Sequence, residues 1–333
     1  MRQRFDQVLV FCPDAVTGGP EALHQFADSI NRQGGIARMV YTGPTSRYAI
    51  KDRLIECTFD QPSVALKAYR RYNPQALGTT EITANTLMVF PEINVDLAWA
   101  MRSCLPCQVA CWWLAVHDLG NTHDEEWCSS FLRNVIQMYQ SQAALAQLQR
   151  RGAHTVIPMF DYTDRNFVRQ GLIQNDSDVQ SPKAAHSVAY FPRKGGDMAS
   201  AFFDSCKDME LVPMRIENMT KAQVVTSLSL SQVYIDFGHQ PGKDRVPREA
   251  AAVGNIVLLH RMGAAVGYLD HNIDEMYKFD RKDIESGALR ALLAQILLDP
   301  ETHRARQAHY RQKIALEQEE FDLQVRQFAF QSL

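Results

Sequence analysis

The start of the chain alternates apolar strands with an amphipathic helix in an order that few folds accommodate. Residues 8–11 form an apolar run of strand length, a loop rich in turn-forming residues follows, and residues 21–32 carry apolar side chains at helical spacing. Gly34 and Gly35 end that helix, and residues 36–41 predict the next strand. Strand, glycine loop, helix and strand make a βαβ unit, which requires a parallel sheet covered by helices.

The same alternation recurs along the chain in two series. The first predicts strands at 86–91, 108–116 and 155–158 and helices at 94–101 and 140–150. The second predicts strands at 187–191, 209–216, 232–237 and 255–259 and helices at 221–228 and 247–253. Residues 170–186 are polar, contain Pro and Ser, and predict a linker. We therefore expect an α/β protein with domains at 1–172 and 187–300. A charged helical tail at 301–333 would be solvated, pack back on the first domain or pair with another chain.

Composition narrows the class of protein. Lys plus Arg is 35 and Asp plus Glu is 38, so the net charge is 35 − 38 = −3, which argues against a nucleic-acid-binding protein. No apolar run reaches the roughly 20 residues that a membrane-spanning helix needs. The apolar start leads into Pro13 and Asp14, as a first strand does and a signal peptide does not. Seven cysteines, an odd number, predict reduced thiols and a cytoplasmic location.

The richest segment for chemistry is residues 234–250, where a strand ends, a loop with glycine and proline follows, and Pro247 suits a first helical turn. A helix N-terminus at the carboxyl end of a parallel strand is a common ligand site. Its amides and nearby cations favour a phosphate or diphosphate, and a carboxylate one turn further on favours a ribose diol. The predicted contacts are Gly238, Lys243, Arg245, Arg248 and Glu249. The alternative is a solvated loop with local ion pairs.

Two further turns follow predicted strands. Arg193 and Lys194 precede two glycines, and two cations with two glycines fit a second diphosphate contact or an ordinary polar turn. Gly18 and Gly19 follow the first strand, where they allow a tight turn and close approach of a ligand. The dinucleotide fingerprint GxGxxG is absent, and a turn without a ligand is the alternative.

Taken together, these motifs resemble the GT-B superfamily of nucleotide-sugar-dependent glycosyltransferases. The matching stretches are the glycine loop at 17–22, the Arg193–Lys194 pair and the phrase EAAAVGNIV at 249–257. More narrowly, residues 112–114, 161–162, 191–195 and 234–250 resemble bacterial polysaccharide-type members. Two departures stand out. The second acidic residue of the family is replaced by Pro241, with Asp236 as the nearest strand-end carboxylate, and Arg193 and Lys194 are adjacent instead of spaced apart.

The resemblance implies two Rossmann-like domains facing a cleft, with the donor in the second and the acceptor in the first. It implies transfer of a sugar from a nucleoside diphosphate to a hydroxyl group of a glycan or lipid-linked acceptor, in surface glycan or polysaccharide biosynthesis. Two rival functions remain open: a nucleotide-sugar epimerase of GT-B type and a non-catalytic subunit of a glycan assembly complex. Peripheral contact with a membrane and a homo-oligomer formed through the C-terminal helix remain open as well.

Catalysis at such a site would be electrostatic, because fixed cations and a helix N-terminus stabilise charge on a departing diphosphate. No Asp-x-Asp metal motif stands in a suitable loop, so we expect no metal and no other cofactor. The candidates for a base that deprotonates the acceptor are His117, Asp118 and His239, although a histidine after a strand is often a structural hydrogen-bonding residue.

The cysteine spacing Cys104-x-x-Cys107-x-x-x-Cys111 resembles a zinc site, but no second CxxC pair exists and Cys111 lies in an apolar strand. We therefore expect no zinc. Because neighbours on a strand face opposite sides, at most one of Trp112 and Trp113 would meet a ligand.

Overall fold

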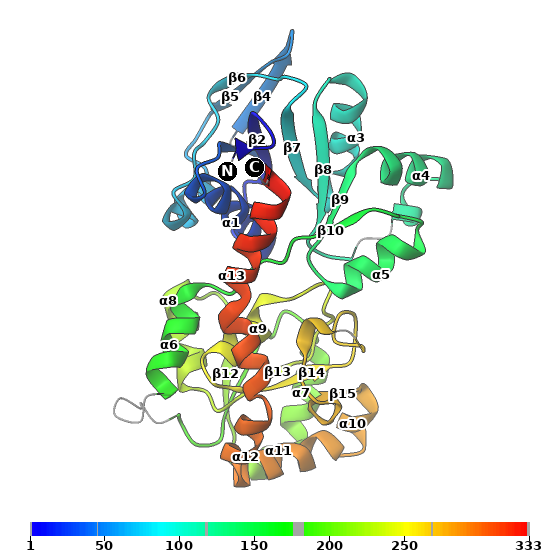
Figure 1. The fold of residues 1–333 in the computed structure, drawn as a ribbon. Helices are drawn as coiled ribbons and strands as arrows, with labels where there is room; N and C mark the ends of the chain where they lie inside the picture. Colours follow the sequence, from blue (N-terminus) through cyan, green and yellow to red (C-terminus); the bar gives the residue numbers. More distant parts are fainter. Residues whose placement is uncertain (1, 45, 117–118, 176–182, 268, 332–333) are drawn as a thin grey trace. The chain divides into compact units, whose positions relative to one another are not determined.

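The computed structural model describes residues 2–44, 46–116, 119–175, 183–267 and 269–331 (Figure 1). Its contacts divide the chain into two units. Unit 1 comprises the residues up to Asp161 and those from Glu319 onward, and unit 2 runs from Tyr162 to Gln318. The division therefore falls about ten residues before the boundary that the sequence predicted, and the end of the chain returns to unit 1. The predicted cleft between the domains stays a prediction.

Unit 1 is built on a six-stranded parallel sheet with helices on its faces, as predicted. The strand order is β10-β9-β8-β7-β2-β3. The strands are β2 (Gln7–Pro13), β3 (Ala37–Thr42), β7 (Thr86–Pro91), β8 (Gln108–Trp113), β9 (Ile136–Tyr139) and β10 (Val156–Pro158). The helices are α1 (Gly18–Arg32), α2 (Val64–Ala68), α3 (Val95–Cys104), α4 (Glu125–Asn134) and α5 (Gln142–Arg150). Residues 8–12 of β2 are fully buried, as expected for a central parallel strand covered on both faces.

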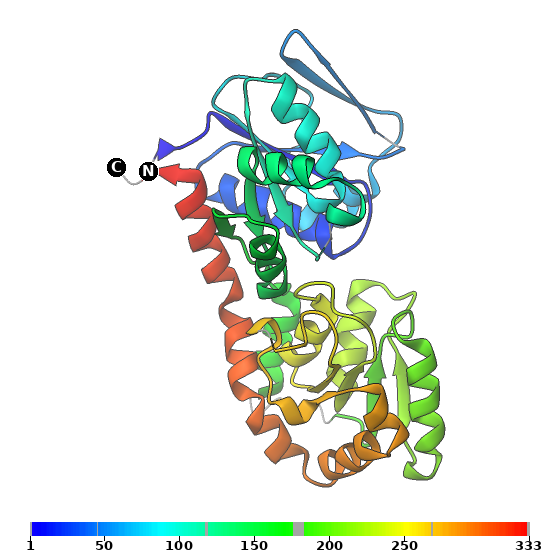
Figure 2. The ribbon, with the colours of Figure 1, turned by 90° about the vertical axis from the view of Figure 1, so that its right-hand side faces the viewer.

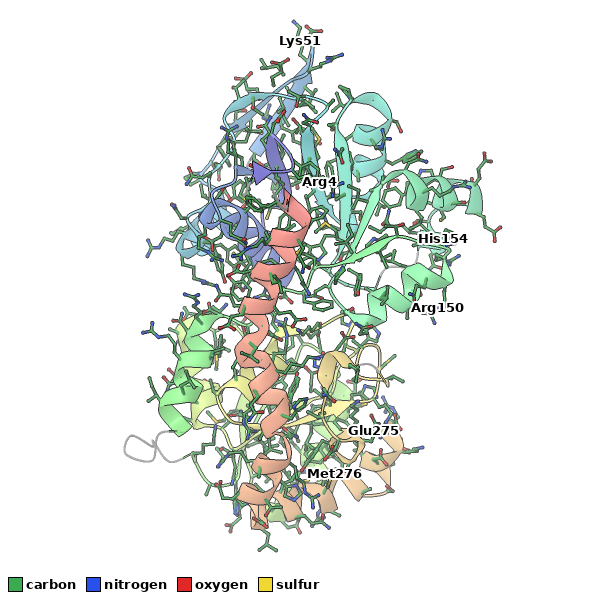
Figure 3. All side chains as sticks on the ribbon, viewed as in Figure 1. Arg4, Lys51, Arg150, His154, Glu275 and Met276 are labelled. Atoms are coloured by element: carbon green, nitrogen blue, oxygen red, sulfur yellow. The ribbon has the colours of Figure 1, made fainter. Side chains whose placement is uncertain are left out.

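Unit 1 also contains a small antiparallel sheet that the sequence did not predict. It consists of β4 (Ser46–Lys51), β5 (Leu54–Phe59) and β6 (Thr79–Glu81). Asp52 and Arg53 form the turn between β4 and β5 with φ angles of 49° and 68°. Figure 3 labels Lys51 at the tip of this hairpin. A non-glycine pair with positive φ gives no strong local turn signal, so the hairpin went unrecognised.

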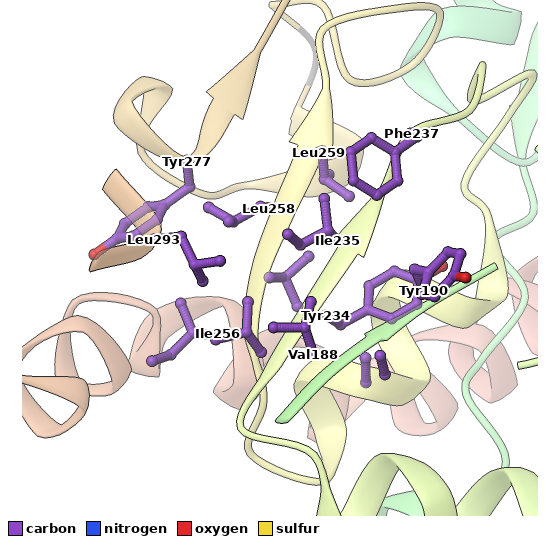
Figure 4. Close-up of a cluster of buried hydrophobic side chains, with 14 of the residues drawn as sticks. Val188, Tyr190, Tyr234, Ile235, Phe237, Ile256, Leu258, Leu259, Tyr277 and Leu293 are labelled. Atoms are coloured by element: carbon purple, nitrogen blue, oxygen red, sulfur yellow. The ribbon is translucent and has the colours of Figure 1, made fainter. Parts of the chain in front are cut away.

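Unit 2 is built on a five-stranded parallel sheet in the order β12-β11-β13-β14-β15. Its strands are β11 (Ser187–Tyr190), β12 (Val212–Arg215), β13 (Val233–Asp236), β14 (Ile256–His260) and β15 (Lys278–Phe279). Its helices are α6 (Arg165–Asn175), α7 (Gly196–Ser205), α8 (Lys221–Leu230), α9 (Arg245–Ala252), α10 (Arg281–Glu285), α11 (Ala288–Leu298) and α12 (Pro300–Arg306). Figure 4 shows the core, where Ile235, Ile256 and Leu293 are buried between the sheet and α11.

Helix α6 corrects the prediction that residues 170–186 form a linker. Residues 170–175 belong to this helix, and residues 176–182 lie outside the described part of the chain. A Cβ atom at Gly171 would lie 1.9 Å from the backbone oxygen of Ala252, so α6 and α9 approach more closely than any larger residue allows. The fully buried Phe167 ring supplies apolar contact on the same helix. Tertiary packing therefore stabilises a helix whose own sequence is polar.

The C-terminal helix α13 (Ala308–Ala329) contributes residues to both units. Within unit 1, its Asp322 accepts hydrogen bonds from Ser29 Oγ (2.5 Å) and from the Arg32 guanidinium of α1 (2.8 Å). The chain then ends beside its beginning, where β16 (Phe330–Gln331) pairs with β1 (Arg2–Gln3), as Figure 2 shows. None of the helices in the described ranges combines the length and apolarity needed to cross a membrane.

Candidate functional site

The candidate site lies at the carboxyl edge of the unit 2 sheet. The chain passes from β11 to its neighbour β12 on one side and then to β13 on the other, so the topology reverses between β11 and β13. In open parallel sheets, ligands bind outside the carboxyl ends of the two strands at such a reversal. The loops that follow these strands are residues 191–195 and 237–244, which contain two of the three segments singled out from the sequence.

The turn after β11 requires its glycine. Gly195 is the N-cap of α7 and has φ +68°, and a Cβ atom there would lie 2.2 Å from the backbone oxygen of Phe237. No side chain among the described residues makes a capping hydrogen bond at this helix start. The first-turn amides of α7 thus lack side-chain acceptors at the reversal point, in the arrangement that binds anions elsewhere.

The two adjacent cations diverge, as expected for neighbouring side chains after a strand. Arg193 is exposed and donates a hydrogen bond to Asn218 Oδ1 (2.6 Å) in the loop after β12. Lys194 forms an ion pair with Asp244 at the start of α9. A Cβ atom at Gly238 would lie 2.4 Å from the Cβ of Lys194, so the two loops pack against each other through a glycine.

The Asp236 side chain, at the end of β13, forms hydrogen bonds with the strand and with the loop that follows it. One of its carboxylate oxygens accepts the amide of Gly238 (2.9 Å) and the other accepts the hydroxyl of Tyr234 (2.9 Å). The Asp236 side chain is buried, and burial, followed by the negative charge of Asp236, raises the pKa of Tyr234. Asp236 therefore stabilises the turn that presents Gly238.

Two predicted phosphate-binding cations are held by a partner that the sequence did not reveal. Glu317, on α13, accepts from Lys243 Nζ (2.8 Å), from Arg248 Nη1 (2.9 Å) and from the amide and hydroxyl of Thr163 (both 2.9 Å). Arg248 is 0% exposed. Burial alone would raise the pKa of Glu317, but the two adjacent cations outweigh burial and hold the pKa at about 2.

This buried network gives Lys243 and Arg248 a structural role. Arg248 also donates to the backbone oxygens of Lys243 (2.9 Å) and Asp244 (3.2 Å), so it fixes the loop leading into α9. Lys243 and Glu317 stand 74 positions apart in the sequence, so local spacing could not show that the two cations already have an anion. Of the other predicted cations, Arg193 is exposed and the Lys194 side chain is 34% exposed.

The remaining donor candidates lie in and beside α9. Arg245 is the first residue of this helix and is half-buried. Glu249 is buried, and its carboxylate lies 3.9 Å from the ammonium group of Lys221, the first residue of α8. Lys221 also pairs with Asp164 (3.1 Å). The glutamate that the resemblance assigns to ribose thus lies next to a cation that sequence reasoning missed.

Of the three predicted bases, the structure describes His239. His239 is exposed in the loop after β13, and its Nε2 atom would lie 2.8 Å from a Cβ atom at Gly263, in the loop after β14. His117 and Asp118 lie outside the described residues.

Unit 1 has an equivalent edge with different chemistry. Its topology reverses between β2 and β7, and α1 begins with Gly18 and Gly19 after β2. Within the part of the chain that the structure covers, no side chain caps α1 at Thr17. A Cβ atom at Gly19 would lie 3.5 Å from Leu114 Cδ1, and the Leu114 amide donates to Glu92 Oε2 (3.0 Å).

Glu92 is a titratable group that the sequence analysis missed. It follows β7 directly and is 6% exposed. Burial raises its pKa to about 7, although hydrogen bonds from the Leu114 and Ala115 amides act in the opposite direction. The only local signal was a glutamate directly after an apolar strand. A carboxyl group with this pKa gains or loses a proton near neutral pH.

Of the cysteine and tryptophan candidates, all except Cys104 belong to the core. Cys104 is exposed, whereas Cys107 and Cys111 are buried. No group of three or more His, Cys, Asp or Glu residues is placed to hold a metal ion in the described residues. Trp112 and Trp113 are both buried, and their indole N–H groups donate to the Met159 carbonyl (2.9 Å) and to Gln137 Oε1 (2.8 Å).

The fold is shared with glycosyltransferases of known structure. A glycosyltransferase from Rickettsia africae matches with a TM-score of 0.65 and 11% identity over 97% of this chain and 96% of that one. HepE of Anabaena, solved in complex with UDP-glucose, matches with a TM-score of 0.63 and 12% identity over 97% and 98%. The pneumococcal O-GlcNAc transferase GtfA, solved with UDP and GlcNAc, matches with a TM-score of 0.60 and 9% identity over 97% and 98%.

The amino-acid sequence matches no protein-family model and no curated protein. The structural likeness nevertheless spans both units and nearly the whole length of each of these chains. The predicted architecture and the resemblance that suggested it are therefore confirmed at the level of the fold: the chain has the GT-B fold, with two Rossmann-like units and a C-terminal helix.

Proposed function

We propose that the protein is a glycosyltransferase that moves a sugar from a nucleoside-diphosphate donor to a hydroxyl acceptor. The observation that carries the proposal is the cationic glycine turn at the reversal point of unit 2. Arg193, Lys194 and the first-turn amides of α7 lie together there. Structural neighbours of the same fold were solved with UDP-glucose or with UDP, which supports a nucleotide-sugar donor at this edge.

The proposed donor site acts through charge. As the bond between the sugar and the diphosphate breaks, negative charge develops on the leaving diphosphate, and fixed cations with oriented amides stabilise that charge. We propose that Arg193 and Lys194 supply the side-chain charge, and that Glu249, whose carboxylate lies 3.9 Å from the ammonium group of Lys221, accepts hydrogen bonds from the ribose. Because this arrangement supplies positive charge itself, we propose that transfer needs no metal ion.

The acceptor hydroxyl must lose its proton as its oxygen bonds to the sugar carbon. We propose that one of the predicted bases, His117, Asp118 or His239, accepts that proton. Glu92 joins these candidates, because its pKa of about 7 suits proton transfer at neutral pH. A surface glycan or polysaccharide precursor as acceptor, a membrane-proximal role and a cytoplasmic location are parts of the same proposal.

A thermal-shift panel tests the donor site first. UDP, GDP, dTDP, ADP and CMP would be added to the full chain with and without EDTA. A ligand at 100 times its Kd stabilises the folded protein by about 2.7 kcal/mol, so we expect one nucleoside diphosphate to raise Tm by several degrees in either condition. Lys194→Met should lose the shift, whereas the matched control Lys282→Met, an exposed lysine on α10, should keep it. No shift with any nucleotide at millimolar concentration would contradict the donor site.

Product analysis then separates the reaction classes. The nucleotide sugar of the base found in the panel would be incubated with the protein, and the products followed by NMR with and without simple glycan acceptors. Release of the nucleoside diphosphate that depends on an acceptor is the expected result. Conversion of the sugar without an acceptor would identify an epimerase, and nucleotide binding without turnover of any sugar would favour a non-catalytic role.

A further inference from the structure

Lys194, the proposed phosphate-binding cation, already holds an anion from its own chain. Its ammonium pairs with the carboxylate of Asp244, and the two side chains are 34% and 18% exposed. Both residues belong to unit 2, and the pair joins the loop after β11 to the loop before α9. A phosphate that binds Lys194 therefore meets an ammonium group that is already paired with a carboxylate.

The carboxylate of Asp244 does not cap the helix that it precedes. Asp244 is the N-cap residue of α9, a position where aspartate normally accepts a hydrogen bond from an amide of the first turn. In the described structure the Asp244 side chain accepts no capping hydrogen bond, and its carboxylate accepts from Lys194 instead. The carboxylate at this helix start is therefore bound to a cation of another loop and not to its own helix.

The surroundings of Asp244 disfavour the charged form of its carboxyl group. Burial raises the pKa of Asp244 to about 6, Lys194 and Arg248 oppose this rise, and Asp236 reinforces it. The Asp236 oxygens are engaged by Tyr234 and Gly238, and Arg248 is bound to Glu317. Two cations act on Asp244, and Arg248 is buried and paired with Glu317. Lys194 is therefore the cation that a ligand can reach.

We propose that Asp244 is the residue that exchanges Lys194 with the donor: it holds this lysine when the site is free of nucleotide, and it takes up one proton from solvent when a donor diphosphate takes its place. The proposal rests on the proposed donor site. Asp244 takes up one proton from solvent when the nucleotide sugar binds, and it returns that proton to solvent when the nucleoside diphosphate leaves and Lys194 pairs with it again. Asp244 thereby weakens the hold on the nucleoside diphosphate product and favours its release.

Isothermal titration calorimetry of the full chain tests this exchange directly. UDP-glucose is the first probe, or the corresponding sugar of the base identified in the thermal-shift panel. A nucleotide sugar is preferable to UDP because its diphosphate is esterified at both ends, whereas a terminal phosphate titrates with a pKa of about 6. Binding enthalpies measured at pH 7.5 in two buffers of different ionisation enthalpy give the number of protons taken up.

For the wild-type protein we expect uptake approaching one proton and affinity that falls by up to about tenfold per pH unit from pH 6.5 to 8. For Asp244→Asn we expect no proton uptake and a flat pH profile. This variant should bind about thirtyfold more tightly than wild type at pH 7.5, which is the cost of protonating a carboxyl group of pKa about 6 at that pH. The matched control Asp204→Asn, which removes an exposed carboxylate at the other end of α7, should behave as wild type.

The outcomes separate this inference from the proposed function. If the wild-type protein binds no nucleotide sugar, the donor site itself is wrong and the exchange falls with it. If the wild-type protein binds one without proton uptake, or Asp244→Asn binds no more tightly, the donor site stands and the exchange is overturned. Tighter binding by Asp204→Asn would attribute the effect to overall charge and would likewise overturn the role of Asp244.

Discussion

The carboxyl edges of the two parallel sheets share a topology and differ in chemistry. Each sheet reverses its strand order at one point, and a helix begins there after a glycine turn, α1 in unit 1 and α7 in unit 2. At the unit 2 edge, Arg193 and Lys194 lie beside the helix start. At the unit 1 edge, the buried carboxyl group of Glu92 lies near it, bonded to the Leu114 amide.

This difference shows which part of a binding edge comes from the backbone and which from side chains. The fold supplies oriented amides at both reversal points, so either edge can receive a polar ligand. Cations make the unit 2 edge suited to a diphosphate, whereas a carboxyl group with a pKa of about 7 suits a neutral hydroxylated ligand and proton transfer. The proposed function therefore assigns donor and acceptor to the two edges on the basis of their side chains, since the two edges share one topology.

The largest effect expected is from Glu317→Ala, which tests whether the buried network supports unit 2 alone. Removing one partner of a buried ion pair costs about 3–5 kcal/mol, because Lys243 and Arg248 would stay buried without this carboxylate. The four tryptophans all lie in unit 1, so urea unfolding followed by tryptophan fluorescence reports that unit, and far-UV circular dichroism reports both. For Glu317→Ala we expect the circular dichroism transition to move to lower urea concentration and the tryptophan fluorescence transition to stay in place. The matched control Glu320→Ala, which removes an exposed carboxylate, should change neither transition by much. Equal shifts in both signals would show that the network does not act on unit 2 alone.

The pH dependence of the stability of unit 1 tests the raised pKa of Glu92. Its folded pKa of about 7 lies above the ordinary value of 4.5, so the folded state binds the proton more tightly than the unfolded state. Stability conferred by this group is therefore present below about pH 4.5 and is lost as the pH rises to 7, by about 3 kcal/mol in total. Tryptophan fluorescence in urea between pH 5 and 8 should show this loss for the wild type relative to Glu92→Gln. Parallel profiles for the two proteins would contradict the raised pKa.

A pair of glycine substitutions compares the two turns directly. Gly195→Ala places a Cβ atom 2.2 Å from a backbone oxygen at φ +68°, and we expect it to destabilise the protein by about 2–3 kcal/mol and to weaken nucleotide binding. Gly19→Ala makes only an ordinary 3.5 Å contact inside a helix, so stability should be unchanged or higher by up to about 1 kcal/mol. Thermal unfolding of the two variants checks both, and similar losses would mean that the two turns are equally constrained.

The smallest effect is expected for Arg193→Ala, which measures how much Arg193 adds to nucleotide binding beside Lys194. Arg193 is exposed and bonds to Asn218, so stability should stay within about 0.5 kcal/mol of wild type. Nucleotide affinity measured by calorimetry should fall about three- to fivefold, less than for Lys194→Met. A larger loss than for Lys194→Met would make Arg193 the main phosphate contact.

The alternating pattern of the sequence determined much of the fold. The strand predicted at 86–91 is β7 with the same bounds, and the first strand and helix match β2 and α1 to within a few residues. Apolar runs of strand length and helical periodicity are local signals, and covered parallel strands make them strong. The β4–β5–β6 sheet and α6 were missed, because their stability comes from pairing and packing and not from a periodic pattern of their own.

The positions of candidate site residues after strands were also readable from the sequence, because strand ends and glycine turns place Arg193, Lys194 and Gly238 at one edge in any doubly wound sheet. Which charges remain available there was decided only by the tertiary structure. Glu317 reaches Lys243 and Arg248 from a helix about 70 residues further on, and Asp244 turns from its own helix to Lys194, 50 residues away. Ion pairs form between groups that the fold brings together, and an isolated sequence carries no record of those distances.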